Sequence, residues 1–502
     1  MATAISEQPD PVIASDHELN RTLGPVHLTM LGIGAIIGAG IFVYTGQVAG
    51  AYAGPAVLIS FVIAALGCLF AGLCYAEFAS MIPVSGSAYT YAYATMGRFM
   101  AWFIGWNLVL EYLVSSSAVA VGWSGYFTEL MQILHINFPA SLTSAPLCVV
   151  GDPPPCPTPW AATGHGFDFF IHQFGATGAI MNLPAVVLIL VLTAVLVVGV
   201  RESANTNALM VGIKLLVVLL VIFFGASFVN WNNFTPFMPA NTGQFGHYGW
   251  SGVAMGSAII FFAYIGFDSV SVAAQECRNP QRDLPIGIMA SLFICTALYI
   301  AISIVLLGMA NYKTMIDIPN PVSFAVGKIS DLHWLVPVID VGASVGLAST
   351  IFVGLYGQSR IFYSMSRDGF LPKMFAAVHT RYKTPYRGTI ITGIFAAALA
   401  AVFPLNLLGQ LVSIGTLLAF AVVCFGTMIL RVQAPRAKRP FRTPLVWVTA
   451  PLGIVFCAGM AWSLPYDTWI RLVIWTAIGV VIYLVYGVWH AAPSKWKVAN
   501  EG

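Results

Sequence analysis

The sequence predicts an all-α membrane protein with twelve transmembrane helices. Hydrophobic residues make up 58% of the 502 residues and charged residues only 8%, whereas soluble domains carry about 25% charged residues. Many apolar stretches reach the roughly 20 residues that a helix needs to cross the hydrocarbon core. They do not alternate between apolar and polar residues as the strands of a membrane barrel would. The composition therefore excludes both a soluble enzyme and a barrel.

The apolar stretches follow one another along almost the whole chain. In order, they are 27–46, 54–80, 98–127, 183–199, 203–229, 250–276, 285–309, 334–364, 387–403, 407–431, 445–464 and 468–490.

Basic residues predict the orientation. When both termini are placed inside, 18 of the 22 Lys and Arg residues fall in cytoplasmic segments. The other four are Lys313, Lys328 and Arg471 on the outer side and Lys214 within the membrane. The long loop 131–182 contains no Lys or Arg, as expected of a translocated segment. The clusters of Lys and Arg are accounted for by the orientation of the chain in the membrane, so they do not indicate nucleic-acid binding. We expect the lipid bilayer as a partner and no nucleic acid. A multi-pass protein of the plasma membrane, the bacterial inner membrane, is predicted.

Cysteine and histidine placement limits the chemistry. Cys148 and Cys156 fall in the outer loop, where an oxidising compartment would allow a disulfide, with two free thiols as the alternative. All nine histidines lie at the ends of the predicted spans or in loops. This distribution argues against a haem or metal enzyme within the bilayer, so we expect no enzyme, no metal and no cofactor.

Two predicted spans carry interruptions in corresponding places. The first contains Gly32, Gly34, Gly38 and Gly40, and the sixth contains Gly266 close to Asp268. Glycine weakens a helix and permits other backbone geometries, although close helix packing is the simpler explanation of any one pair. In lipid, unwound backbone is tolerated only where it lines a cavity or meets a ligand. We therefore predict two five-helix repeats of opposite topology around a shared site.

This repeat predicts the organisation of the chain. The predicted parts are a cytoplasmic amino-terminal tail (1–26), a first repeat (27–229, with the outer loop 131–182), a second repeat (250–431), two further helices (445–490) and a cytoplasmic carboxy-terminal tail (491–502).

Broken helices suit a zwitterion, because the exposed N–H end favours anions and the carbonyl end favours cations. We expect the N–H groups of Ala39 and Gly40 to face a carboxylate. An α-ammonium would meet four backbone carbonyls, those of Ile36, Phe262, Ala263 and Ile265. The substrate side chain would then point elsewhere and determine specificity.

Four segments carry a family resemblance. LGIGAIIGAGIFV, CYAEFASMIPVSGSAYTYAYATMG, FFAYIGFDSVSVAAQECRNPQRDLPIGI and YGQSRIFYSMSRDGFLPKMF closely resemble the cationic amino acid transporter family, bacterial type, of the amino acid–polyamine–organocation superfamily. The resemblance implies a leucine-transporter-type fold of ten core helices plus two, with proton-linked rather than sodium-linked uptake. Ala39 departs from the family pattern, since many superfamily members carry Ser or Thr there. Gln275, beside Glu276, stands where relatives often carry a second acid.

Lys214 lies about eleven residues into the fifth span, which places it roughly 16 Å deep, or half the hydrocarbon thickness. A charge there costs about 2.5–3.5 kcal/mol even on the lenient insertion scale. The resemblance suggests that its ammonium replaces the cation held between spans 1 and 8 of sodium-coupled members, and that it gains and loses a proton during transport. A permanent ion pair with a carboxylate is the structural alternative.

Glu111 and Asp268 complete the predicted charged set. Glu111 is expected to carry the proton or to attract a cationic substrate side chain, or else to be a protonated carboxyl bonded to a neighbouring helix. Asp268 is expected either to cap the resumed sixth helix or to contact substrate or proton.

We therefore predict proton-coupled uptake of L-amino acids, either cationic (Arg or Lys) or small and neutral (Ala-like), by alternating access. An amino acid or polyamine exchanger and a non-transporting sensor of the same fold are the alternatives. The sequence does not say whether an accessory membrane subunit binds.

Overall fold

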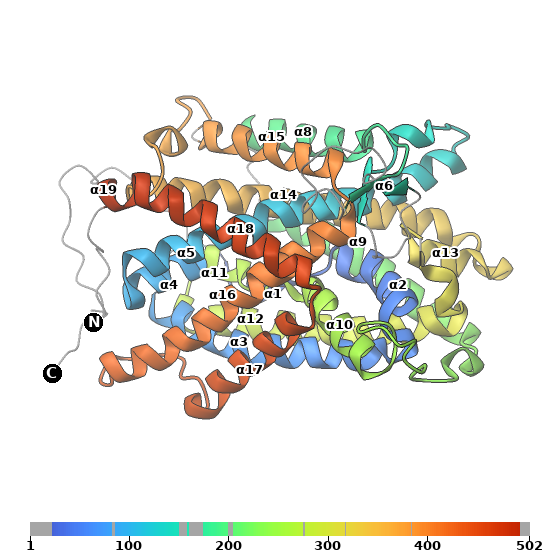
Figure 1. The fold of residues 1–502 in the computed structure, drawn as a ribbon, viewed down its shortest axis with the longest axis horizontal. Helices are drawn as coiled ribbons and strands as arrows, with labels where there is room; N and C mark the ends of the chain where they lie inside the picture. The colour runs from blue at the N-terminus through green and yellow to red at the C-terminus, as the bar shows by residue number, and fades with distance from the viewer. Residues whose placement is uncertain are drawn as a thin grey trace.

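The computed structural model describes residues 23–82, 86–149, 158–159, 174–198, 204–274, 277–316, 318–382 and 384–491. It is mostly helical, and Figure 1 shows the helices running side by side in one bundle. The helices are α1 (Pro25–Ile36), α2 (Thr45–Val48), α3 (Val57–Met81), α4 (Ser87–Met96), α5 (Arg98–Val109), α6 (Ser115–Ile133), α8 (Leu183–Val198), α9 (Ala204–Gly225), α10 (Gly249–Ile260), α11 (Ser269–Val272), α12 (Pro280–Met309), α13 (Pro321–Gly327), α14 (Leu335–Arg367), α15 (Tyr386–Val402), α16 (Leu405–Gln433), α17 (Val446–Ser463), α18 (Tyr466–Ile482) and α19 (Val488–His490).

These helices make the chain an integral membrane protein. Within the described residues, nine helical runs are long and apolar enough to cross a membrane, and α1, α8 and α15 are apolar but shorter. The apolar side chains of α18 and its neighbours face outward, as Val473, at 64% exposed, illustrates. Such outward apolar surface belongs in lipid. The predicted helical class is confirmed, while the arrangement as twelve spans stays a prediction.

The structure adds elements that hydropathy did not predict. Helices α4 and α13 lie between the predicted spans. Hydropathy did not predict them because each is too short to cross the bilayer. The outer loop also forms a small antiparallel sheet in the order β1 (Leu147–Val149), β3 (Phe174–Ala176), β2 (Thr158–Pro159). Cys148 in β1 is disulfide-bonded. Cys156 lies outside the described residues, so the predicted pairing stays a prediction. Gln275 and Glu276 also lie outside them.

Small residues let the helices approach one another closely. A Cβ at Gly342 of α14 would lie 2.3 Å from the Val217 side chain of α9, and a Cβ at Gly409 of α16 would lie 1.9 Å from the Tyr44 hydroxyl. Because apolar burial does not drive association in lipid, packing at small residues of this kind holds membrane helices together. Glycine therefore determines where α14 meets α9 and where α16 meets the segment that carries Tyr44.

A buried ion-pair cluster joins α3 to α16, at the end of the bundle that the predicted orientation places inside. Arg431 donates to both carboxylate oxygens of Glu77 at 3.0 and 2.7 Å, and Arg439 donates to Oε1 at 3.1 Å. The backbone N–H of Thr443 donates to Oε2 at 2.8 Å. Glu77 is fully buried. The cluster thus ties the loop before α17 to both helices.

We expect Glu77→Gln to destabilise the protein by about 3–5 kcal/mol, because it leaves two partly buried guanidinium groups without a counter-charge. The unfolding midpoint of the detergent-solubilised protein measures this. Asp331→Asn, a change of the same kind at an exposed residue, is the control. Equal midpoints for the two variants would show that the cluster does not hold the helices together.

Candidate functional site

The first predicted interruption is present in the structure. Helix α1 ends at Ile36, and Ile37 is extended with ψ of 96°. A π-helical turn then begins at Gly40 and leads into α2. Within the described residues, no backbone carbonyl accepts a hydrogen bond from the N–H of Gly38 or Ala39. The first N–H groups of a helix have no partner inside it, so this end offers free donors near the predicted carboxylate site.

The sixth predicted span is interrupted at the same depth of the bundle. Helix α10 passes into a 3₁₀ turn, Phe261–Tyr264, and Ile265 is extended with ψ of 134°. Gly266 has φ of +121°, a conformation that side chains with a Cβ rarely adopt. A Cβ there would lie 2.8 Å from the backbone carbonyl carbon of Ala35. Gly266 thus lets one broken helix pass directly over the other.

The two interruptions meet. A Cβ at Gly40 would lie 2.2 Å from the Cβ of Ala263, so the first and sixth segments touch at this point. Gly38 faces Thr350 of α14, whereas Gly34 lies inside α1 and precedes the interruption by two residues. The sequence predicts Gly34, Gly38 and Gly266 as the glycines that break the helices, and of these Gly38 and Gly266 lie at the interruptions.

Tyr299 of α12 bonds to both interruptions. Its hydroxyl lies 2.8 Å from the carbonyl oxygen of Ile36 and 2.7 Å from that of Ala263. The hydroxyl has one proton to donate, so these two of the four predicted ammonium-binding carbonyls share a single donor. The Phe262 carbonyl accepts from the N–H of Ile265 at 3.3 Å. The sequence did not predict a role for Tyr299, because the residues around a tyrosine in an apolar helix do not indicate which groups its hydroxyl will contact.

Lys214 is fully buried and bridges α9, α1 and α14. Its ammonium donates to the carbonyls of Gly34 at 2.6 Å and Ile37 at 3.0 Å, and it lies 3.5 Å from that of Gly346. The Thr350 hydroxyl is 3.4 Å away. Four oxygens thus surround the ammonium, and none of them belongs to a carboxylate. The predicted alternative, a permanent ion pair with a carboxylate, does not occur among the described residues.

Glu111 and Asp268 lie together at the site. Asp268 accepts hydrogen bonds from the hydroxyls of Tyr112 at 2.9 Å and Ser87 at 3.3 Å, and the Glu111 carboxyl interacts with it. Within the described part of the chain, neither Glu111 oxygen accepts a hydrogen bond. Asp268 makes no side-chain capping bond to α11. The capping role predicted for Asp268 was therefore wrong, since the side chain is held from α4 and the turn before α6.

A cavity of about 50 Å³ lies at the interruptions, and we call it the central cavity. The interrupted backbone contributes Ile36, Gly38 and Gly40, and the facing walls contribute Glu111 and Val119. Further lining residues are Ala35, Ala39, Tyr112, Ser115, Phe262, Ile265, Gly266, Ser269, Thr350, Val353 and Gly354. The structure thereby brings five of the six predicted backbone contacts and Glu111 to one small space, whereas Ala263, Lys214 and Asp268 do not line it.

Aromatic residues tie the segment after the first interruption to its neighbours. The ring of Tyr44 lies 5.0 Å from that of Phe262, and its hydroxyl donates to the carbonyl of Leu405 at 3.0 Å. The Tyr126 hydroxyl donates to the carbonyl of Phe42. These contacts join the part of the first segment that follows the interruption to α16 and α6.

Residues 23–489 match the amino acid permease family. The chain belongs to this family. A methylthioribose transporter and a branched-chain amino acid permease, both from Bacillus subtilis (strain 168), are each 43% identical to the chain over 95% of both sequences. A vacuolar cationic amino acid transporter from Arabidopsis thaliana is 37% identical over 84% of this chain and 61% of its own length.

The family resemblance seen in the sequence is thereby confirmed. The chain is a transporter-type membrane protein and not an enzyme, because the family and these relatives are transporters. The relatives carry different substrate names, so family membership alone leaves the substrate side chain open.

We expect Gly266→Ala to weaken binding of the amino acid substrate by roughly 5- to 150-fold. A Cβ would strain the φ of +121° by about 1–3 kcal/mol and would press on the Ala35 backbone. Equilibrium binding to the purified protein measures the effect. Gly459→Ala in α17, where a Cβ meets nothing within 4 Å, is the matched control. Unchanged affinity for Gly266→Ala would remove this crossing from the site.

Proposed function

We propose that the protein is a proton-coupled secondary transporter that takes up L-amino acids across the plasma membrane by alternating access. The observation that carries this proposal is the meeting of two interrupted helices at the central cavity. Free N–H groups and backbone carbonyls converge there, and a low-dielectric interior tolerates such groups only beside a ligand or a cavity.

We also propose twelve spans built as two five-helix repeats of opposite topology, followed by two further helices, with both termini in the cytoplasm. The short helices α1, α8 and α15 supply the spans that length alone does not identify. The interruptions fall in the first helix of each predicted repeat, which supports an inverted pair.

The proposed binding mode follows the polarity of the interruptions. The substrate carboxylate binds the N–H groups of Ala39 and Gly40, and its ammonium binds the carbonyls of Ile36 and Ala263 with those of Phe262 and Ile265. A carbonyl oxygen has two lone pairs, so Tyr299 leaves each of its two carbonyls one further bond. The binding then rests on backbone groups, because Ala39 offers no hydroxyl.

A neutral aliphatic side chain suits the walls better than a cationic one. Val119, Val353 and Phe262 line the central cavity, and its volume of about 50 Å³ suits a small group. Glu111 is the one wall residue that would favour Arg or Lys, but its carboxyl faces Asp268. The name of the branched-chain permease from Bacillus subtilis agrees with this choice.

Two features support proton coupling. Two buried carboxyls side by side, Glu111 and Asp268, repel each other when both are ionised, so the pair favours holding a proton. Lys214 holds α1 against α14 through its ammonium, and loss of its proton would remove one donor and the charge that attract these carbonyls. Proton movement at either place would therefore change how the helices are held.

Uptake of labelled amino acids into proteoliposomes under an imposed proton gradient tests the proposal. We expect accumulation of leucine, isoleucine and valine well above that of arginine and lysine. Preference for arginine or lysine would reassign Glu111 to the substrate side chain. Flux that needs an amino acid on the opposite side would indicate an exchanger, and binding without flux would indicate a sensor.

We expect Lys214→Ala to abolish proton-driven accumulation while some substrate binding remains, because the carbonyls of Gly34 and Ile37 lose their charged donor. Uptake at several external pH values, alongside equilibrium binding, measures both properties. Lys313→Ala, at an exposed lysine, should behave as the unmodified protein. An unchanged pH dependence in Lys214→Ala would exclude Lys214 from coupling.

A further inference from the structure

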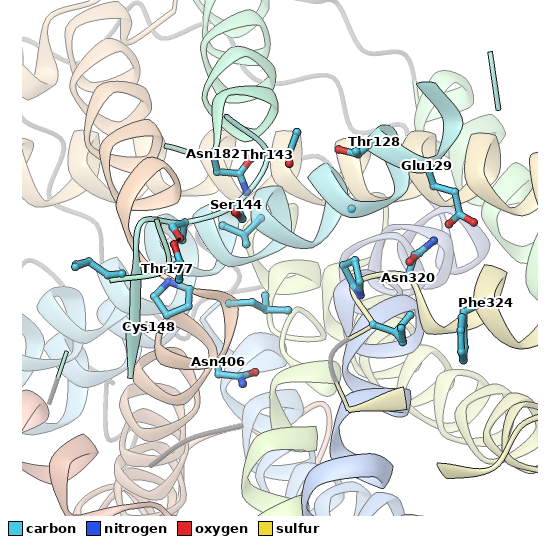
Figure 2. Close-up of a pocket in the computed structure, with 18 of the residues that line it drawn as sticks. Thr128, Glu129, Thr143, Ser144, Cys148, Thr177, Asn182, Asn320, Phe324 and Asn406 are labelled. Atoms are coloured by element: carbon cyan, nitrogen blue, oxygen red, sulfur yellow. Dashed lines mark hydrogen bonds between the residues drawn. The ribbon is translucent and has the colours of Figure 1, made fainter. Parts of the chain in front are cut away.

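The two ends of the bundle are built differently. At the end that the predicted orientation places outside, a cavity of about 570 Å³ lies between α6, the outer loop and the segments before α13 and α16, as Figure 2 shows. Helix α4 lies at the opposite end of the bundle from α13 (Figure 1) and contacts α11, the helix that follows the second interruption. Asp268, directly before α11, is fully buried. Helix α4 therefore covers the sixth segment on the inner side.

Ser87, the first residue of α4, has a strained backbone. Its φ is +50°, in the left-handed region that residues with a Cβ seldom occupy. Such a conformation persists only where the surrounding structure holds it, and it is found most often at sites that work or switch. Ser87 is fully buried, and its hydroxyl donates to Oδ2 of Asp268 at 3.3 Å. The strained residue thus presents a hydrogen-bond donor to the sixth segment.

Tyr89, two residues further along α4, ties the same helix to α14. Its hydroxyl donates at 2.7 Å to Oδ2 of Asp368, the residue directly after α14. Its ring packs edge-on to Phe370, with the ring centroids 6.0 Å apart, and the Tyr93 ring packs on the same phenylalanine at 5.5 Å. One short hydrogen bond and two aromatic contacts therefore anchor α4 at the inner end of α14.

Helix α4 is thus joined to two different parts of the bundle. One is the interrupted sixth segment, through Ser87, and the other is α14, through Tyr89. Alternating access requires the inner side of the site to open, and the sixth segment must then part from the helix that covers it. The connection that breaks is the one through Ser87, because its hydrogen bond is longer and has no aromatic contact beside it.

We propose that Tyr89 is a positioning residue for transport and that it acts through Ser87. By anchoring α4 to Asp368, it holds Ser87 in its strained conformation against Asp268. We call the Ser87–Asp268 hydrogen bond the inner latch, and it keeps the inner side of the site closed until the sixth segment moves. Neither Ser87 nor Tyr89 lines the central cavity, so the inner latch controls access and not contact with the substrate. This inference rests on the proposed function.

The half-saturating concentrations of L-leucine for entry and for exit test the inner latch, in vesicles of one orientation without an imposed gradient. Loss of the latch favours the form that is open to the inside. We expect Ser87→Ala to raise the ratio of the entry value to the exit value about three- to tenfold, as for the loss of one hydrogen bond. Tyr89→Phe should raise the ratio too, and the double variant should raise it no further than Ser87→Ala alone.

Two matched substitutions are the controls. Ser330→Ala removes an exposed bond between a serine and an aspartate, that to Asp331, and Tyr466→Phe removes the hydroxyl of an exposed tyrosine. Both should leave the ratio within about twofold of the unmodified protein. A defect that only reduced the amount of folded protein would lower Vmax and would leave the ratio unchanged.

Hydrogen exchange of the purified protein tests the inner latch without requiring flux. The backbone amides of α11 should exchange about three- to tenfold faster in Ser87→Ala and in Tyr89→Phe. Those of α13, at the other end of the bundle, should keep the rate of the unmodified protein.

An unshifted ratio in Ser87→Ala would overturn the inner latch, as would unchanged exchange of α11 in this variant. Additive shifts in the double variant would overturn the positioning role of Tyr89. The two proposals fail separately. Amino acid flux with an unshifted ratio removes only the inner latch, whereas absence of flux in the unmodified protein removes the transport function and leaves hydrogen exchange to decide the latch.

Discussion

Backbone polar groups that leave a helix inside the membrane must find other partners, and the whole site depends on how the chain meets this requirement. Two helices are interrupted where they cross. The ammonium of Lys214 donates to carbonyls of the first segment, and the hydroxyl of Tyr299 lies within hydrogen-bond distance of one carbonyl from each segment. The N–H groups of Gly38 and Ala39 find no backbone acceptor among the described residues. The interruptions are therefore stable only as part of a polar centre that also suits a zwitterion.

The contacts that follow the two interruptions are hydrogen bonds from side-chain hydroxyl groups. After the first interruption, tyrosine hydroxyls donate to backbone carbonyls of other segments, as Tyr44 does to Leu405. After the second interruption, Asp268 accepts hydrogen bonds from Tyr112 and Ser87. Each of these contacts consists of only one or two hydrogen bonds. The Glu77 cluster with its two arginines is of a different kind, because breaking a buried multidentate ion pair is much more costly.

Much of this arrangement could be predicted from the sequence because it rests on local pattern. Hydropathy identified the membrane class, four glycines within nine residues indicated the first interruption, and depth along the fifth span singled out Lys214. Other parts escaped prediction for equally physical reasons. Helices α4 and α13 are too short for a hydropathy signal, and nothing in the sequence around Tyr299 indicates its two carbonyl partners. Asp268 has the right position for a cap, yet its side chain bonds to another helix.

Three things were determined by the sequence alone: that the chain lies in lipid, at which residues its first helix is weakened, and which buried charges need a partner. Residue type and spacing determine them because they act locally. Only the tertiary structure decided which atoms those charges meet. Lys214 and Gly34 are separated by 180 residues along the chain, and Tyr112 and Asp268 by 156. Contacts across such distances depend on how helices approach one another, and that approach is decided by packing at glycines spread over the whole bundle.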